Sequence, residues 1–262
     1  MEGKSFKWDA KLYQKSSSFQ FNLGLMAIEK LKPVDKETIL EIGCGNAMLT
    51  IELAKLIPNG KIIAIELSKD MVKHAKSNLV EYGINNVNIE NIDAIKMDYK
   101  NEFDAVFSNS AIHWIKDLEL MYRLIYDSLK NSGRILIQSS LKEINVLFQV
   151  LFDLVKLTNY KEYFKNFRFP WRFLTVKENY KLLKSINFQN ITVEPYSYSI
   201  QFDSEDDVIN FCKAAPLVPL LNSIPIELVD NFIEDFKKVF FKINQPNPLE
   251  IKMTRVFISA KK

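Results

Sequence analysis

The stretch ILEIGCGNAML, residues 39–49, decides the fold of this chain. Its apolar start is typical of a buried β-strand that ends at Ile42, and apolar residues at helical spacing resume from Ala47. The turn between them contains Gly43 and Gly45, two of only seven glycines in the chain. Because small residues let a ligand approach the backbone, this strand, turn and helix indicate a ligand-binding loop, with a tight turn that binds nothing as the alternative.

Short β-rich segments alternate with helical segments around this loop. An amphipathic helix is expected over 17–32, before Pro33. Further helices are predicted over 47–57, from Ser68 onward and over 117–130. Strands are predicted over 38–43, 61–66, 87–91, 103–109 and 133–139. Alternation of this kind is typical of parallel βαβ units, so the first half of the chain predicts a doubly wound α/β sheet.

The second half of the chain has a different character, with many Phe and Tyr residues among Lys and Asn. Two strands, 191–200 and 253–260, are long enough to pair with each other and to join the edge of the sheet. Helices are predicted at about 144–166, 175–186, 204–213 and 226–241. We therefore expect N-terminal helices and the sheet core in residues 1–140, and helical cap insertions plus the last two strands in 141–262.

Composition gives no support for several functional classes. The 262 residues are 47% apolar, and 35 Lys and Arg stand against 32 Asp and Glu, so the net charge of +3 favours neither a nucleic-acid partner nor a membrane surface. No stretch approaches the roughly 20 apolar residues that span a bilayer. Cys44 and Cys212 form neither a disulfide framework nor a cluster with metal-ligand spacing. We expect a soluble, cytoplasmic protein without a metal.

Carboxylates follow the next two strands of the predicted sheet. Glu66 ends the second strand, 21 residues after Gly45, where it could accept two hydrogen bonds from a ribose diol. Asp93 and Ala94 occupy the loop after the third strand, where a carboxylate and a backbone N–H could bind the edge of an adenine. The three consecutive loops are therefore expected to converge on one crevice.

These segments carry a family resemblance. EIGCGNA, IAIELS and NIDA resemble the successive cofactor motifs of class I S-adenosyl-L-methionine (SAM)-dependent methyltransferases, whose first motif is E/D-x-G-x-G-x-G. The one departure is Ala47, which stands where the family has its third glycine. The resemblance covers residues 1–140 and implies a Rossmann-like, mostly parallel seven-stranded sheet with an antiparallel C-terminal hairpin, and SAM as the cofactor.

The resemblance also implies roles for individual residues. Residues around the first loop would hold the methionine portion, those after the second strand the ribose, and those after the third strand the adenine, while two N-terminal residues would close over the cofactor. The implied cofactor-binding residues are Tyr13, Gln14, Glu41, Gly43, Cys44, Gly45, Glu66, Leu67, Asp93, Ala94 and Asn109.

A small-molecule methyl acceptor is expected beside the cofactor. FSNSAIHWIKD, with His113 and Trp114, resembles the matching segment of the trans-aconitate methyltransferase group, whose members methylate carboxylates. Arg168 and Arg172 flank Phe-Pro-Trp and could clamp a carboxylate, because a guanidinium pairs with it bidentately. A packed aromatic pair and two exposed loop arginines are the alternatives for these four residues, which we take as the candidate catalytic set.

Competing functions remain at this point. A nicotinamide-binding G-x-G-x-x-G loop would need glycine at position 48, which is Met48, and the Tyr180 and Lys184 pair is interpreted as an exposed helix face. Carboxyl O-methylation of a small molecule is the leading hypothesis. N- or C-methylation of a larger metabolite, or SAM binding without methyl transfer, are the alternatives.

Overall fold

A computed structural model of the chain describes residues 10–142, 146–214, 216–243 and 249–262. The chain divides into two compact units, each made of several segments. We call residues 19–141, 171–196 and 255–262 the α/β unit. Residues 1–18, 142–170 and 197–254 form what we call the helical unit.

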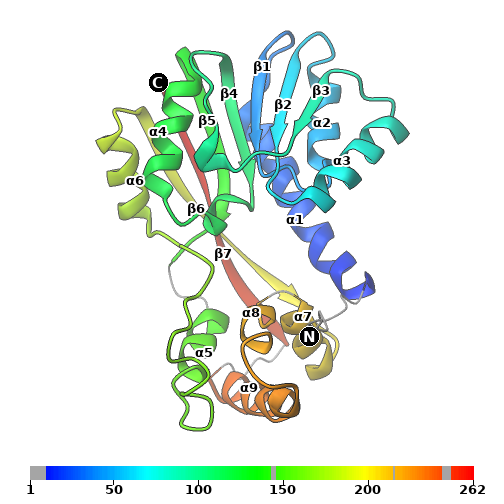
Figure 1. The fold of residues 1–262 in the computed structure, drawn as a ribbon, viewed down its shortest axis with the longest axis vertical. Coiled ribbons are helices and arrows are strands. Elements are labelled where there is room, and N and C mark those ends of the chain that lie inside the picture. The colour runs from blue at the N-terminus through cyan, green and yellow to red at the C-terminus, as the bar shows by residue number, and fades with distance from the viewer. Residues whose placement is uncertain (1–9, 143–145, 215, 244–248) are drawn as a thin grey trace. The chain divides into compact units, whose positions relative to one another are not determined.

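Within the described residues, seven strands form one sheet in the order β3-β2-β1-β4-β5-β7-β6. Neighbours from β3 to β5 pair in parallel, and β7 runs antiparallel to β5. The predicted fold class, a mostly parallel Rossmann-like sheet with antiparallel C-terminal strands, is confirmed (Figure 1). The strands are β1 Thr38–Ile42, β2 Lys61–Ile65, β3 Val87–Glu90, β4 Phe103–Asn109, β5 Leu129–Ser140, β6 Gln189–Gln201 and β7 Glu250–Lys261.

Helices α4 (Leu118–Ser128) and α6 (Val176–Ser185) cover one face of the sheet and lie side by side in Figure 1. Tyr122 of α4 and Leu183 of α6 are both fully buried in a core that also includes alternate residues of the strands. Both helices begin where the sequence predicts, because Asp117 and Thr175 accept hydrogen bonds from backbone N–H groups of the first turn. Side-chain capping thus sets two of the helix starts.

Three more helices complete the α/β unit: α1 (Ala10–Leu31), of which the unit contains the part from residue 19, α2 (Met48–Leu56) and α3 (Lys69–Glu81). A Cβ on Gly24 would lie 2.1 Å from Leu49 of α2, so α1 and α2 pack closely at that glycine. Two single-turn 3-10 helices, η1 (Ala94–Lys96) and η2 (Ile112–Trp114), follow strands β3 and β4. The carboxyl ends of β3 and β4 are therefore each followed by a single helical turn.

The helical unit contains α5 (Val146–Leu154), α7 (Glu205–Ala214), α8 (Val218–Leu221), η3 (Ile226–Leu228) and α9 (Val229–Ile243). Helix α5 contacts α9, whose Phe232, Phe236 and Phe240 are buried. The prediction of one helix over 144–166 is wrong in its second half, because α5 ends at Leu154 and turns follow. Tyr160 in these turns is buried against Phe232, with ring centroids 4.9 Å apart, so tertiary packing overrides the helical spacing.

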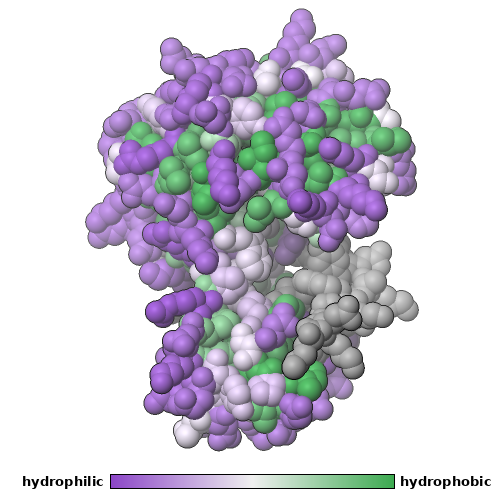
Figure 2. Space-filling model, viewed as in Figure 1, coloured by the Kyte–Doolittle hydropathy of each residue, from purple (hydrophilic) through white to green (hydrophobic). Residues whose placement is uncertain are grey.

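Hydrophilic and hydrophobic residues both reach the surface on the face of the α/β unit that Figure 2 shows. Figure 2 shows hydrophilic side chains along the outline of the α/β unit, with hydrophobic residues in patches between them. Among the described residues, no helix combines the length and apolar character needed to cross a membrane.

Candidate functional site

The glycine loop leaves β1 and is tied to the neighbouring strand. The N–H groups of Gly43 and Cys44 donate to Ile65 O of β2 at 2.8 and 3.3 Å. Gly43 and Gly45 have φ of 74° and 55°. A Cβ on Gly43 would lie 2.3 Å from Ala111 Cβ, whereas a Cβ on Gly45 would meet nothing within 4 Å. Gly43 thus permits two loops to approach, while Gly45 faces space that a ligand can fill.

Ala47, the departure from the family motif, adopts the conformation that the third glycine would favour. It precedes α2 with φ 65° and ψ 16°, and its side chain is fully buried. A left-handed conformation costs an L-residue about 1–2 kcal/mol, so alanine is tolerated here with strain.

Glu66, the residue after β2, is hydrogen-bonded to this loop. Its Oε2 accepts a hydrogen bond from Gly45 N at 3.0 Å, and its Oε1 accepts one from Ser68 N at 2.9 Å. Leu67, which follows it, is 68% exposed, and Asn91 Nδ2 donates to the Glu66 and Leu67 carbonyl oxygens at 2.8 and 2.9 Å. A carboxylate has about four acceptor positions, so Glu66 keeps capacity for ligand hydroxyls.

Glu41 of β1 is a buried acid beneath the loop. It is 2% exposed, and its Oε2 has no hydrogen-bond partner among the described residues. Burial raises the pKa of Glu41 to about 7, and the Thr50 hydroxyl opposes this rise without reaching hydrogen-bond geometry. A buried carboxyl oxygen without a partner suits a cationic ligand group such as an ammonium.

The loops after β3 and β4 complete this edge of the sheet. Asp93 Oδ1 accepts from Ile95 N at 3.2 Å and thereby caps η1, which begins at the buried Ala94. Asn109, the last residue of β4, donates from Nδ2 to Gln20 O of α1 at 3.4 Å, and its Oδ1 has no partner in the described residues. Because β3, β2, β1 and β4 are parallel neighbours, these groups share the carboxyl edge of the sheet, where α/β proteins bind ligands.

Of the remaining predicted cofactor residues, the structure describes the side chain of Cys44 but not those of Tyr13 and Gln14. Tyr13 and Gln14 lie in the part of α1 whose side chains fall outside the description. Cys44 is 7% exposed, and burial raises the pKa of its thiol, which disfavours the reactive thiolate. No group of three or more His, Cys, Asp or Glu suited to a metal ion occurs among the described residues.

His113 follows β4 in η2 and is buried in the α/β unit. Its Nδ1 lies 3.2 Å from Ser139 Oγ of β5. Burial, and then the positive charge of Arg255, lower the pKa of His113 to about 3. The imidazole is therefore neutral at physiological pH and is a weak proton acceptor.

Aromatic rings surround this histidine at the surface of the α/β unit. Trp114 is 53% exposed, and its ring centroid lies 5.6 Å from that of His113 and 6.0 Å from that of Trp171. Phe173 stacks on Trp171 at 6.1 Å and contacts His113 at 5.7 Å. Arg172 fixes residues 171–173 against η2. Its backbone N–H donates to His113 O and its Nη1 donates to Lys116 O, both at 2.8 Å.

The two predicted clamp arginines belong to different units. Arg172 lies in the α/β unit, whereas Arg168 lies in the helical unit and is exposed.

A third arginine, which the sequence did not single out, is buried at the same end of the sheet as His113. Arg255 of β7 is 7% exposed, pairs in register with Ser140 of β5 and donates from Nη1 to Ser140 Oγ. Gln138, two residues earlier on β5, is fully buried, and its Nε2 has no partner among the described residues. The sequence signal for this buried polar group is the run Gln138 to Ser140, which follows the apolar residues 135–137 and ends β5.

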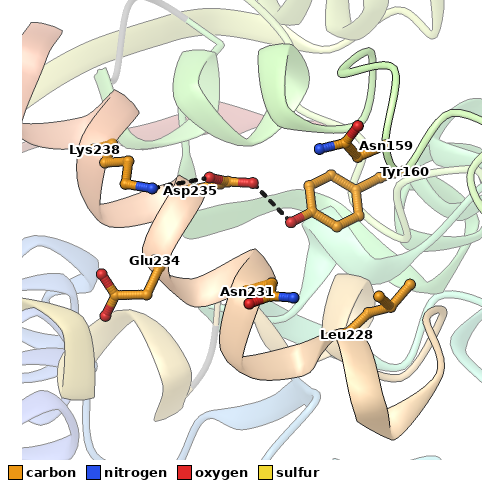
Figure 3. Close-up of a pocket in the computed structure, with 7 residues that line it drawn as sticks. All are labelled: Asn159, Tyr160, Leu228, Asn231, Glu234, Asp235 and Lys238. Carbon is orange, nitrogen blue, oxygen red and sulfur yellow. Dashed lines mark hydrogen bonds and ion pairs between the residues drawn. The ribbon is translucent and has the colours of Figure 1, made fainter.

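A separate cavity of about 290 Å³ lies wholly within the helical unit. Figure 3 shows Tyr160 and Asp235 pointing toward each other, with Tyr160 Oη donating to Asp235 Oδ2 at 2.8 Å and Lys238 paired with Asp235. None of the predicted site residues lines it.

Comparison with known proteins gives a consistent result. Residues 33–184 match a family model described as a methyltransferase domain. The chain is 27% identical over 242 residues to juvenile hormone acid O-methyltransferase of Bombyx mori, covering 87% of this chain and 84% of that protein. It is 30% identical over 136 residues to malonyl-[acyl-carrier protein] O-methyltransferase of Priestia megaterium, covering 51% and 48%. The solved YcgJ protein of Bacillus subtilis shares the fold, with a TM-score of 0.63, 20% identity and coverage of 92% and 97%.

Proposed function

Since the chain belongs to the methyltransferase-domain family and is a SAM-dependent methyltransferase, we propose that it methylates a carboxylate oxygen of a small molecule. The cofactor supplies a methyl group on a positively charged sulfonium. In the proposal Glu66 accepts hydrogen bonds from the ribose hydroxyls and Glu41 faces the ammonium of the methionine portion. Asp93 and Ala94 bind the adenine.

The proposal for the acceptor is carried by the exposed Trp114, the last residue of η2, which follows β4. Its ring stands in an aromatic cluster with Trp171 and Phe173, and it follows Asn109, on the methionine side of the cofactor loops, by five residues. Arg172 adds positive charge to this surface, which attracts an anion. One relative of the chain is named for O-methylation of an acid and another for O-methylation of a malonyl-[acyl-carrier protein], which supports a carboxylate as the acceptor.

The fate of the proton also favours a carboxylate. An ionised carboxylate attacks without losing a proton, so positioning alone supplies most of the catalysis. An ammonium acceptor would first have to lose a proton to a base. The one imidazole of the aromatic cluster, His113, has a pKa lowered to about 3 by burial and is a poor base. In the proposal His113 is a neutral residue that supports the aromatic surface.

The test uses the whole chain with methyl-labelled SAM and a panel of benzoate, octanoate and adipate, together with amines, phenols and a sterol. A methyl ester releases labelled methanol in mild alkali, whereas N-methyl and C-methyl products keep the label. Label released from an acid product supports the proposal. Turnover only of amines or ring carbons, or binding of SAM with no turnover at all, would refute it in favour of an alternative function.

A pair of matched variants tests the aromatic surface. Trp114→Ala removes a ring that is 53% exposed, and Tyr180→Ala removes one that is 48% exposed on α6. Because a buried aromatic contact contributes about 1–3 kcal/mol, we expect Trp114→Ala to raise the acceptor KM about 5- to 150-fold, with the KM of Tyr180→Ala unchanged. Equal effects of the two variants would count against a role for Trp114.

A further inference from the structure

Five polar residues gather at the carboxyl ends of β4 and β5 on the face of the sheet that α1 covers. Asn109 pairs in register with Gln138, and Ser140 pairs with Arg255. In a sheet, paired residues and residues two positions apart on one strand point to the same face, so these four share one face. Ser110 joins them, because its Oγ donates to Gln138 Oε1 at 2.9 Å.

The face is the one next to α1 by two independent contacts. Asn109 Nδ2 donates to Gln20 O of α1. Phe257, which pairs with Gln138, lies under Lys30 Nζ of α1 at 5.2 Å from its ring centroid. All of these residues belong to the α/β unit.

Two polar atoms of this cluster are buried without partners among the described residues, Asn109 Oδ1 and Gln138 Nε2. Turning the Gln138 amide would exchange its two atoms and still leave one of them without a partner, because Ser110 Oγ can satisfy only one. A buried polar group without a partner costs about 1–3 kcal/mol. Fold stability therefore does not account for an amide at this position, where Leu136 shows that an apolar residue fits the same face two residues earlier.

Arg255 adds a buried cation to these unsatisfied groups. Its side chain is 7% exposed and donates to Ser140 Oγ through Nη1. A guanidinium retains its charge at all physiological pH values and binds carboxylates through two parallel hydrogen bonds. The cluster thus combines a permanent positive charge with a neutral amide donor beside it.

We propose that Arg255 and Gln138 bind the carboxylate of the methyl acceptor, donating hydrogen bonds to the oxygen that does not receive the methyl group. This inference rests on the proposed carboxyl methylation. During transfer the other carboxylate oxygen forms the new O–C bond as the C–S bond breaks, and the bonding pair stays on sulfur, so no proton moves. The acceptor enters as an anion and leaves as a neutral ester.

This change of charge has a measurable consequence. Arg255 attracts the acid and not the ester, so the enzyme binds the acid more tightly and releases its product. Losing a hydrogen bond to a charged group lowers affinity about 10- to 100-fold. Arg255→Met should therefore raise the KM for the acid by that factor and leave the affinity for its methyl ester within about twofold.

The experiment measures two ligands on the full chain saturated with S-adenosylhomocysteine (SAH), the demethylated cofactor. The ligands are the best acid substrate among benzoate, octanoate and adipate, and its methyl ester. Calorimetry gives both dissociation constants for the wild type and for Arg255→Met, Arg255→Lys and Gln138→Leu. Gln138→Leu keeps the side-chain bulk, so it tests the subsite even where Arg255→Met fails to bind SAH. We expect a selective loss of acid binding, about tenfold for Gln138→Leu.

Arg134→Met is the matched control, because Arg134 lies at the other end of the same β5–β7 pair and is bonded to Glu37. It should lower stability without changing the preference for acid over ester. If the Arg255 and Gln138 variants bind the acid and the ester equally more weakly, the two residues have a structural role. That result would overturn this inference and leave the proposed function standing. A wild type that methylates none of the acids would overturn this inference together with the proposed function.

Discussion

Two glycines allow the cofactor loop to be tested without disturbing the fold. Gly45 in the loop and Gly83 after α3 both have positive φ, 55° and 67°, and a Cβ on either would meet nothing within 4 Å. Replacement by alanine should therefore cost each fold a similar free energy of unfolding, about 1–2 kcal/mol for the left-handed backbone. Gly43 is unsuitable, because its Cβ would collide with Ala111.

Only one of the two substitutions should affect ligand binding. A methyl group on Gly45 would enter the space that the cofactor occupies in our proposal, and overpacking of this size costs about 1–3 kcal/mol. We expect the dissociation constant for SAH to rise about 5- to 150-fold in Gly45→Ala and to stay unchanged in Gly83→Ala.

The assay is calorimetric titration with SAH, with NAD as a ligand control, at a temperature well below the thermal unfolding midpoint of both variants. Thermal unfolding checks that the two folds are destabilised alike. If Gly45→Ala binds SAH as tightly as Gly83→Ala, the space in front of Gly45 does not hold the cofactor. Binding of NAD in preference to SAH would contradict the assignment of SAM as the cofactor.

Three further predictions use the unusual environments of single residues. Because burial raises the pKa of Glu41 to about 7, binding of a cationic ammonium should ionise it, so SAH affinity should rise with pH up to about 7 and then level, and Glu41→Gln should lose this dependence by calorimetry. Ala47→Gly should leave SAH binding intact and change the free energy of unfolding by at most about 1 kcal/mol, in the stabilising direction, because it relieves a φ of 65°. The pKa of His113 falls from 6.5 to about 3 on folding, so the unfolded chain takes up a proton first and stability should decline as pH falls from about 6.5, by up to about 4–5 kcal/mol. Denaturant titrations at several pH values should show a shallower decline for His113→Gln, and an identical decline would contradict the assignment.

The sheet, and the edge that the candidate cofactor residues share, could be predicted because local rules govern them. Apolar runs such as KIIAI predict strands that are buried on both faces, and parallel pairing then places Glu41, Glu66 and Asp93 at one edge whatever the details of packing. Side-chain caps at Asp117 and Thr175 similarly set helix starts within the first turn.

Contacts between distant residues decided the rest. Helix α5 stops at Leu154 because Tyr160 packs on Phe232, 72 positions away, and helical spacing alone carries no trace of that contact. Ser140 and Arg255 meet only through the antiparallel register of β5 and β7, across 115 residues of chain. Local pattern determines which segments become strands and helices, but burial and register arise from the whole fold, and they set the charge state and the neighbours of each polar side chain.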